Sequence, residues 1–319
     1  MYNQTEAILS QYEIEVKEIT KGRGSFICNT DKGKKVLLPF RGSKEKGMQL
    51  YQFLLALQEK NFVVEQIELT KKKEAVAEDE YTGELFLLKN YVEGSEISTS
   101  RIEDMKEAIH LLAIYHNVSE QINGQTQDIE LEVWRRHYRE LIKVRNYIRN
   151  RKKKNEFEQI YMKHFEHNLQ FAEKSIRLLE ECEEPAPRCV YCHGDFNQHN
   201  ILLSSGTYRI INFEGISYNW AMVDVAHFLR KMLEKNDWSE VLGKELVAEY
   251  ERYRPMYRTE YRQLYGLLLF PEKFWKVTNH YMNSRKTWIA ERDVEKLKKV
   301  IEQEEKRLNF MENVFAFLG

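Results

Sequence analysis

The N-terminal third of the chain mixes two hydrophobic periods. Segments in which apolar and polar residues alternate predict short β-strands, and they span residues 14–19, 25–30, 35–39, 62–69, 75–81 and 84–92. Apolar residues at helical spacing predict a short helix over 4–12 and a main helix over 44–60. Turn signals at 31–33 and 82–83 join neighbouring strands as hairpins. The pattern therefore predicts a small antiparallel sheet with one main helix packed on it.

Beyond the polar link at 93–96 the period is almost entirely helical. The predicted helices span residues 100–122, 129–149, 156–181, 223–234, 238–253, 258–283 and 293–317. Pro185 and Pro187 interrupt this series, and residues 188–215 have the pattern of short strands joined by loops. The chain is thus predicted to be an α+β protein with two lobes, a β-rich domain over 1–93 and a helical domain over 94–319 that carries the 188–215 segment.

Composition excludes several classes of protein. The 49 Lys and Arg residues nearly balance the 50 Asp and Glu residues, so net charge gives no reason to expect a nucleic-acid or membrane partner. The N-terminus lacks a basic region followed by an apolar core, and no apolar stretch approaches the roughly eighteen residues of a membrane span. Four cysteines in 319 residues are too few for a disulfide framework. We expect a soluble, cytoplasmic protein.

The candidate chemistry lies in the sequence HGDFNQHN, residues 193–200. Asp195 is followed five residues later by Asn200, which is the spacing of a kinase catalytic loop. In such a loop the aspartate accepts the proton of the substrate hydroxyl and the asparagine binds magnesium. Because an apolar strand precedes this loop, His193 is expected to shape the turn that exposes Asp195.

A second polar segment, RIINFEG, follows the loop at 209–215. Asn212 stands seventeen residues after Asp195, where a kinase places a metal-binding aspartate, and Glu214 offers a nearby carboxylate. Asp224 begins the next predicted helix and is interpreted as its N-cap, with bracing of the catalytic loop as a second role. Capping of turns is the alternative role for Asp195 and Asn200, but it does not explain the strand pair that follows them.

Taken together, these motifs resemble the aminoglycoside phosphotransferase and choline kinase-like superfamily. HGDFNQHN, INFEG, WAMVDVAHFLRK and LLKNYVEGSEIS carry the resemblance, which within that superfamily is strongest to the CotS group of spore-coat proteins. It implies a bilobal kinase-like fold that binds ATP and Mg²⁺ between its lobes, with Asp195 as the base and Asn200 and Asn212 as metal ligands. It also implies a small-molecule hydroxyl acceptor or spore-coat proteins as partners, and synthesis in the mother-cell cytoplasm with deposition in the spore coat.

The same resemblance assigns a nucleotide site and exposes two departures from the family. The residues that it places around the adenine and the phosphates are Val36, Leu38, Leu88, Lys89, Asn90 and Tyr91. Leu38 stands where the family has a phosphate-binding lysine, and Asn212 stands where it has a metal-binding aspartate. Displaced substitutes for the lysine are Lys34, Arg41 and Lys44. The losses remove one cation and one anion from the same place, which weakens the case for a site that binds Mg-ATP.

Three functional interpretations remain. The first is a kinase-like coat protein whose phosphoryl transfer is weak or lost, and the second is an active ATP-dependent kinase of a small hydroxyl compound. The third is a zinc-binding module, whose ligands would be Cys182, Cys189, Cys192 and His199. Against zinc, residues 189–192 lie in an apolar run that predicts a buried strand.

Overall fold

The computed structural model describes residues 2–22, 24–124, 130–182, 188–284 and 291–318. Ile129, Pro185 and Pro187 lie outside these ranges. The chain forms two compact units, one of residues 1–97 with 193–216 and the other of residues 98–192 with 217–319. The catalytic-loop segment therefore belongs to the first unit, whereas the sequence analysis assigned it to the helical domain. Among the described residues, no helix has the length and apolar character needed to cross a bilayer.

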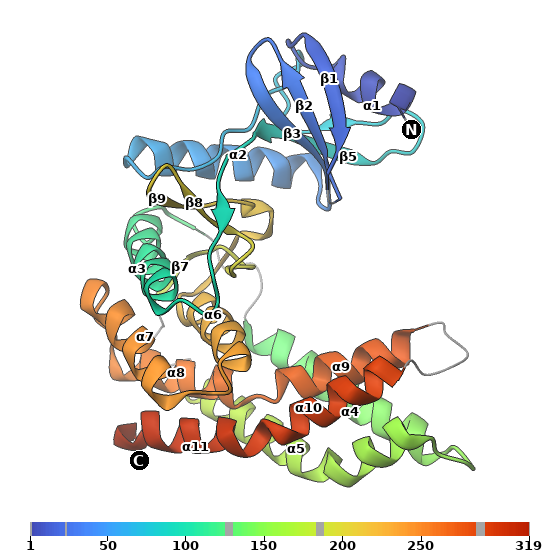
Figure 1. Cartoon of the computed structure of the whole chain (residues 1–319), viewed down its shortest axis with the longest axis vertical. Coiled ribbons are helices and arrows are strands. Elements are labelled where there is room, and N and C mark those ends of the chain that lie inside the picture. The colour runs from blue at the N-terminus through green and yellow to red at the C-terminus, as the bar shows by residue number, and fades with distance from the viewer. Residues whose placement is uncertain (1, 23, 125–129, 183–187, 285–290, 319) are drawn as a thin grey trace. The chain divides into compact units, whose positions relative to one another are not determined.

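The first unit contains the predicted antiparallel sheet (Figure 1). Its strands, in spatial order, are β1 (Val16–Lys21), β2 (Phe26–Thr30), β3 (Gly33–Phe40), β5 (Leu85–Asn90) and β4 (Ala77–Glu78). Neighbouring strands pair antiparallel throughout, and the turns at 31–33 and 82–83 stand where the sequence predicts them. The small sheet of a kinase-like fold is thus confirmed.

The two faces of this sheet have different neighbours. Leu37 on β3 lies opposite Leu88 on β5, and both are buried in a cluster with side chains of the first helix, α1 (Tyr2–Leu9). Because side chains alternate along a strand, Val36 and its partner Lys89 point to the opposite face. The main helix, α2 (Lys44–Glu59), begins with Ser43 accepting a hydrogen bond from the backbone of Lys46.

The strand predicted over 62–69 is not formed. This segment meets β5 only through scattered contacts, such as the Asn90 N–H donating to the Gln66 carbonyl at 2.9 Å. Its apolar residues do not alternate cleanly between buried and exposed, since Val63 is 60% exposed while Phe62 and Ile67 are buried. The segment nevertheless brings Glu65, only 4% exposed, against the face of β5 that carries Lys89.

The first unit also contains a three-stranded sheet of order β6-β8-β9. Its strands are β6 (Ser95–Glu96), β8 (Ile201–Ser204) and β9 (Thr207–Ile210), and a short 3-10 helix, η1 (Phe213–Gly215), follows. The pairing of β6 with β8 places the polar link beside the catalytic-loop segment. That pairing is the physical reason why residues 193–216 group with the N-terminal part of the chain.

The second unit is mainly helical (Figure 1). Its helices are α3 (Ile102–Ser119), α4 (Glu130–Arg149), α5 (Glu156–Glu180), α6 (Met222–Lys235), α7 (Glu240–Tyr253), α8 (Arg258–Leu269), α9 (Glu272–Asn283), α10 (Glu291–Glu302), α11 (Glu304–Val314) and the 3-10 turn η2 (Ala316–Leu318). One two-stranded sheet joins β7 (Cys189–Cys192) to β10 (Ser217–Trp220). The buried strand predicted at 189–192 is confirmed, but β10 was not predicted.

Two predicted helices are each broken in two. The helix expected over 258–283 breaks at Pro271, because proline has no N–H to donate to Leu267 and forces Phe270 out of helical geometry (φ −58°, ψ 130°). Arg230 donates instead to the Leu267 carbonyl at 2.6 Å. The helix expected over 293–317 divides into α10 and α11 at Gln303. Both interruptions therefore lie where apolar spacing alone gave no signal.

Candidate functional site

Residues 193–200 form a polar loop before β8. Asp195 is exposed, and its carboxylate is held from both sides within the loop. Its Oδ1 accepts the side-chain amide of Asn197 at 2.8 Å, and its Oδ2 accepts the amide of Asn200 at 3.0 Å. Two amides of the same loop thus fix the orientation of this exposed carboxylate.

His193 and Gly194 bind the catalytic loop to the segment that follows β9. The buried His193 ring donates from Nε2 to the Ile211 carbonyl at 2.9 Å and accepts the Asp195 N–H at Nδ1, at 3.3 Å. Gly194 has a φ of +80°, and a Cβ built there would lie 2.2 Å from the Gly215 carbonyl oxygen. The two polar segments are thus in direct contact, and only glycine fits at position 194.

Asn212 joins the two segments chemically. It follows β9 in the left-handed conformation (φ 66°, ψ 58°), and its side-chain amide donates to Asn200 Oδ1 at 2.8 Å. Its own Oδ1 accepts the Lys89 ammonium at 2.9 Å. The amides that the sequence assigned as metal ligands therefore bond to one another. The carbonyl oxygen of each is engaged within the protein.

Lys89 supplies a cation that sequence reasoning did not find. Lys89 is predicted to lie in the adenine-contacting segment, yet its amine is bonded to Glu65 at 3.0 Å and to Glu214, and its side chain is only 3% exposed. Burial alone would lower the pKa of Lys89, but the two carboxylates outweigh it and hold the pKa above its usual value. The available signal was a lysine that directly follows four apolar residues in the strand LFLLKN.

Glu65, which the sequence analysis did not single out, also binds main chain. Its carboxylate accepts the N–H groups of Asn212, at 3.1 Å to each oxygen, and of Phe213 at 3.1 Å. These are the first donors of the η1 turn, which a negative charge stabilises. One buried carboxylate thereby fixes both the Lys89 ammonium and the backbone of the 212–213 segment.

The remaining residues assigned to the nucleotide site are dispersed over β3 and β5. Leu88 is buried on the α1 face and cannot present its side chain to the Lys89 face. Val36 and Leu38 are half-buried and apolar. Asn90 accepts from the buried Lys35 at 2.7 Å, and Tyr91 is 38% exposed. The side chains of β3 therefore offer no cation on the face that carries Lys89, apart from Lys34 near its beginning.

The proposed substitutes for the missing lysine are engaged or exposed elsewhere. Lys34 pairs with the exposed Glu93 at 2.8 Å, and Lys44 pairs with Glu78 at 2.7 Å. Arg41 is exposed. Of the lysines discussed, the one whose amine bonds to Asn212 is Lys89.

Asp224 lies in the helical unit and is not an N-cap. Helix α6 begins at Met222 after Ala221, so Asp224 falls within its first turn, where it is 1% exposed. Its carboxylate bonds to His116 Nε2 at 3.3 Å, and His116 Nδ1 bonds to the Tyr250 hydroxyl at 2.7 Å. Burial lowers the pKa of His116, so the imidazole is neutral at pH 7. The N-cap interpretation was wrong because the helix begins at Met222, two residues before Asp224, and Ala221 occupies the N-cap position.

The zinc set of the third interpretation does not form among the described residues. Cys192 donates to the Trp220 carbonyl at 3.2 Å, and Cys182 donates to the Leu178 carbonyl at 3.1 Å. Burial raises the pKa of the Cys182 and Cys189 thiols, which disfavours the thiolate that zinc requires. The described His, Cys and acidic side chains form one compact buried group, His116, Cys192 and Asp224. Its members already share hydrogen bonds with each other and with Tyr250 and Trp220.

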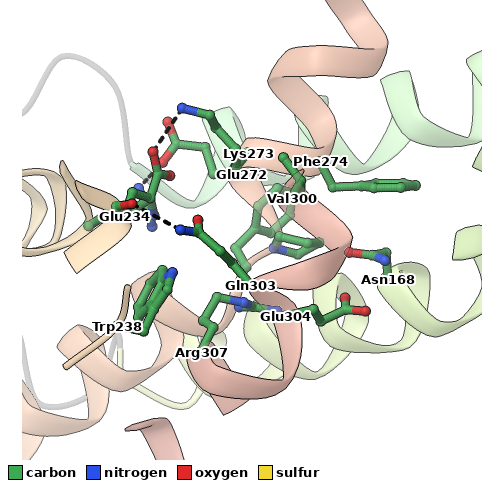
Figure 2. A pocket seen from close by; sticks show the side chains of 13 residues that line it. Asn168, Glu234, Trp238, Glu272, Lys273, Phe274, Val300, Gln303, Glu304 and Arg307 are labelled. Carbon is green, nitrogen blue, oxygen red and sulfur yellow. Dashed lines mark hydrogen bonds and ion pairs between the residues drawn. The ribbon is translucent and has the colours of Figure 1, made fainter. Parts of the chain in front are cut away.

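A cavity of about 40 Å³ lies between helices of the second unit (Figure 2). Lys273 pairs with Glu234 at 2.8 Å on its rim, and Gln303 donates to the Glu234 carbonyl at 3.1 Å. Arg307 donates to the carbonyls of Leu268 and Leu269 at the end of α8. A space of this volume holds only a few water molecules. The cavity beside the broken helix is therefore too small to hold an acceptor molecule.

We expect the unfolding free energy to fall as the pH drops from about 6.5 to about 4. His137 is stacked on Trp275 at 3.5 Å, and burial, aided by the charges of Arg136, Lys276 and Arg230, lowers its pKa to about 4. Because the unfolded chain binds this proton at higher pH, acid favours unfolding across that window. Denaturant titrations at pH 7 and pH 4.5 measure the loss, which His137→Phe should reduce. An equal loss in the variant would contradict the assignment to His137.

Comparison with known proteins agrees with this geometry. The family described as "Spore coat putative kinase YutH" matches residues 5–314. Spore coat protein S of Bacillus subtilis (strain 168) is 23% identical over 96% of this chain and 92% of its own length. The fold is shared with the aminoglycoside phosphotransferase of Alicyclobacillus acidocaldarius, with a TM-score of 0.83 and 19% identity over 98% of this chain and 96% of that one.

A second solved structure extends the comparison to a complex with bound ligands. Spectinomycin phosphotransferase APH(9)-Ia, in complex with ADP and spectinomycin, has a TM-score of 0.65 and 13% identity, covering 99% of this chain and 97% of that one. The sheet, the helical unit and the catalytic-loop segment therefore form a kinase-like fold. The match over nearly the whole length establishes that the chain belongs to the YutH family of kinase-like spore-coat proteins.

Proposed function

We propose that this chain is a spore-coat-associated protein that keeps the phosphotransferase fold while its Mg²⁺-dependent phosphoryl transfer is weak or lost. The supporting observation is the bond of 2.8 Å between the Asn212 amide and Asn200 Oδ1. In a kinase these two positions bind magnesium through oxygen. Here one of them presents an N–H to the other.

The residues present do not fit a bound Mg²⁺. Magnesium requires oxygen ligands at about 2.1 Å in a nearly ideal octahedron. Asn200 Oδ1 accepts from Asn212, while Asn212 Oδ1 accepts from Lys89, so each oxygen already has a donor. A neutral amide also replaces a carboxylate at position 212, and electrostatic stabilisation is commonly the largest contribution to phosphoryl transfer. Both effects reduce the affinity of the site for Mg-ATP.

We infer the location and the partners from the family match. A relative of this chain is named a spore coat protein, and we infer synthesis in the mother-cell cytoplasm followed by association with coat proteins. On this interpretation the kinase-like fold serves as a binding scaffold. Its surface, rather than a transferred phosphate, would carry the function.

An active ATP-dependent kinase is the second candidate. It is favoured by Asp195, whose exposed carboxylate is oriented by Asn197 and Asn200 as a base should be. The related structures include kinases whose complexes hold AMP-PNP with Ca²⁺ or ADP. This candidate requires Glu214 and Asn200 to hold the metal. Glu214, however, is paired with Lys89.

The Asn212→Asp variant should separate the two candidates. Aspartate has no side-chain N–H, so the variant frees Asn200 Oδ1 and adds a carboxylate beside it. We expect ATP to raise the Tm of the variant only when Mg²⁺ is present, and to leave the wild-type Tm unchanged with or without Mg²⁺. Ligand at a hundredfold excess over its Kd would add about 2.7 kcal/mol of stability. The measurement is a thermal-shift titration of both proteins.

Asn61→Asp is the matched control for this titration. Asn61 also has a left-handed backbone (φ 60°) but lies in an exposed turn after α2, so the variant makes the same chemical change away from the site. Its response to Mg-ATP should equal that of wild type. A wild-type shift with Mg-ATP, accompanied by phosphate transfer to an added alcohol, would refute the proposed loss and support the active kinase.

A further inference from the structure

The Lys89 ammonium has three oxygen partners, which come from two separate segments. Glu65 Oε1 lies 3.0 Å away, Asn212 Oδ1 lies 2.9 Å away, and Glu214 Oε1 is also hydrogen-bonded. These residues come from the stretch after α2 and from the segment after β9, while Lys89 itself belongs to β5. An ammonium has three N–H donors, and three acceptors surround this one.

The partners of Lys89 are the ligands that a hard divalent cation prefers. Two carboxylates and an amide oxygen converge on one point, which is the donor chemistry of magnesium and manganese sites. The distances of 2.9–3.0 Å from Nζ to Glu65 and Asn212 fit N–H···O bonds rather than metal bonds of about 2.1 Å. The cage is therefore filled by the side chain, with the single positive charge of an ammonium at its centre.

We propose that Lys89 is a tethered replacement for a divalent cation. Its ammonium holds β5, Glu65 and the 212–214 segment together without any ligand, and it fills a cation site that removal of the amine would open. This inference rests on the proposed loss of Mg-ATP dependence and explains how the segment remains ordered without metal. This role differs from that of the phosphate-binding lysine that the resemblance expects on strand β3. The carboxylates bonded to Lys89 are buried or half-buried acidic groups, which would need another cation if the ammonium were absent.

The charge balance of the cage supports this assignment. Glu65 and Lys89 are almost completely buried, and Glu214 is 21% exposed. Two carboxylates so close together repel each other unless a cation lies between them. A buried charge that loses its partner is strongly destabilising. Removal of Lys89 should therefore leave a site that takes up a small divalent cation from solution.

The experiment compares wild type with Lys89→Met, using Mn²⁺ or Mg²⁺ alone and no nucleotide. Methionine keeps the length of the side chain but removes the charge. We expect the variant to have a lowered Tm in chelator, and Mn²⁺ at a hundredfold excess over its Kd to raise that Tm by about 5 °C. The wild-type Tm should not change. A variant that responds to Mn²⁺ no more than wild type does would overturn the proposal.

Three further variants keep the result interpretable. Lys34→Met removes an exposed lysine paired with Glu93 and should not respond to Mn²⁺. Adding Glu214→Gln to Lys89→Met removes one ligand charge and should weaken the response. Lys89→Met alone could fail to fold in chelator. In that case Lys89→Met is combined with Glu65→Gln, which leaves fewer unpaired charges. This double variant should also bind Mn²⁺, whereas wild type should not. Absence of Mn²⁺ binding by that combination would count against the proposal.

The use of metal alone keeps this test separate from that of the proposed function. Wild-type stabilisation by Mg-ATP would refute the loss of metal-dependent nucleotide binding, whatever Lys89→Met does. Conversely, a failure of Lys89→Met to gain Mn²⁺ binding would remove the tethered-cation role and leave the Asn212 result standing.

Discussion

Gly194→Ala should destabilise the protein by about 3 kcal/mol or more. Alanine at a φ of +80° carries a backbone strain of about 1–2 kcal/mol. Its Cβ would also lie 2.2 Å from the Gly215 carbonyl oxygen, and that contact can be relieved only by separating the two loops. Denaturant titration followed by tryptophan fluorescence measures the loss. Because the loops carry Asp195 and Asn212, the variant should also disturb the candidate site.

Gly206→Ala is the control that isolates the contact from the strain. Gly206 has nearly the same φ, +79°, but a Cβ there meets nothing within 4 Å. It should therefore lose only about 1 kcal/mol, the cost of alanine in the left-handed region. Equal losses at positions 194 and 206 would mean that the loops separate freely, contrary to the packing described here.

Glu65→Ala should cost about 3–5 kcal/mol of stability. The substitution leaves the buried Lys89 ammonium with one carboxylate, Glu214, and removes the acceptor for the N–H groups of Asn212 and Phe213. Chemical denaturation again measures the change. Glu65→Gln should lose less, because its amide oxygen can still accept from the ammonium and from the main chain.

Glu93→Ala provides the matched control. It also removes the carboxylate of a lysine pair in the first unit, but Glu93 and Lys34 are both exposed, with side chains 75% and 41% accessible. Exposed pairs contribute little because water and salt screen them. We expect no measurable change in stability. A loss at position 93 comparable to that at position 65 would show that burial is not what makes the Lys89 pair important.

Local patterns predicted most of the fold. The hairpins of the sheet followed from alternation and turn residues, and the long helices followed from their apolar period. Among the elements predicted wrongly, the unbroken helix over 258–283 and the strand over 62–69 failed for physical reasons that hydrophobic periodicity does not reflect. Pro271 stands inside an apolar run that remains helical on both sides, and the 62–69 segment is apolar without being a strand. Tertiary contacts decided the second, whereas the first follows from the backbone chemistry of proline, which apolar spacing does not register.

The candidate site was predictable only where its residues are close in sequence. Asp195, Asn200 and Asn212 belong to one segment with known spacing, and the structure brings them into one hydrogen-bonded chain. Glu65 and Lys89 lie more than a hundred residues before Asn212, so their role depends on strand register and on an irregular segment. Spacing along the sequence predicts neither the strand register nor the path of the irregular segment. The resemblance pointed to Leu38 as a departure from the family, but it did not point to Lys89 as the cation that bonds to Asn212.

The contacts of Glu65 with the 212–213 segment also bear on how the site can change over generations. They are made to main-chain N–H groups, which every residue except proline possesses. These hydrogen bonds therefore do not depend on which side chain stands at position 212, and the left-handed backbone there (φ 66°) accepts asparagine and aspartate alike. A substitution there can abolish a metal ligand while the loop keeps its shape, so a lineage could lose the chemistry in one step without first losing the fold.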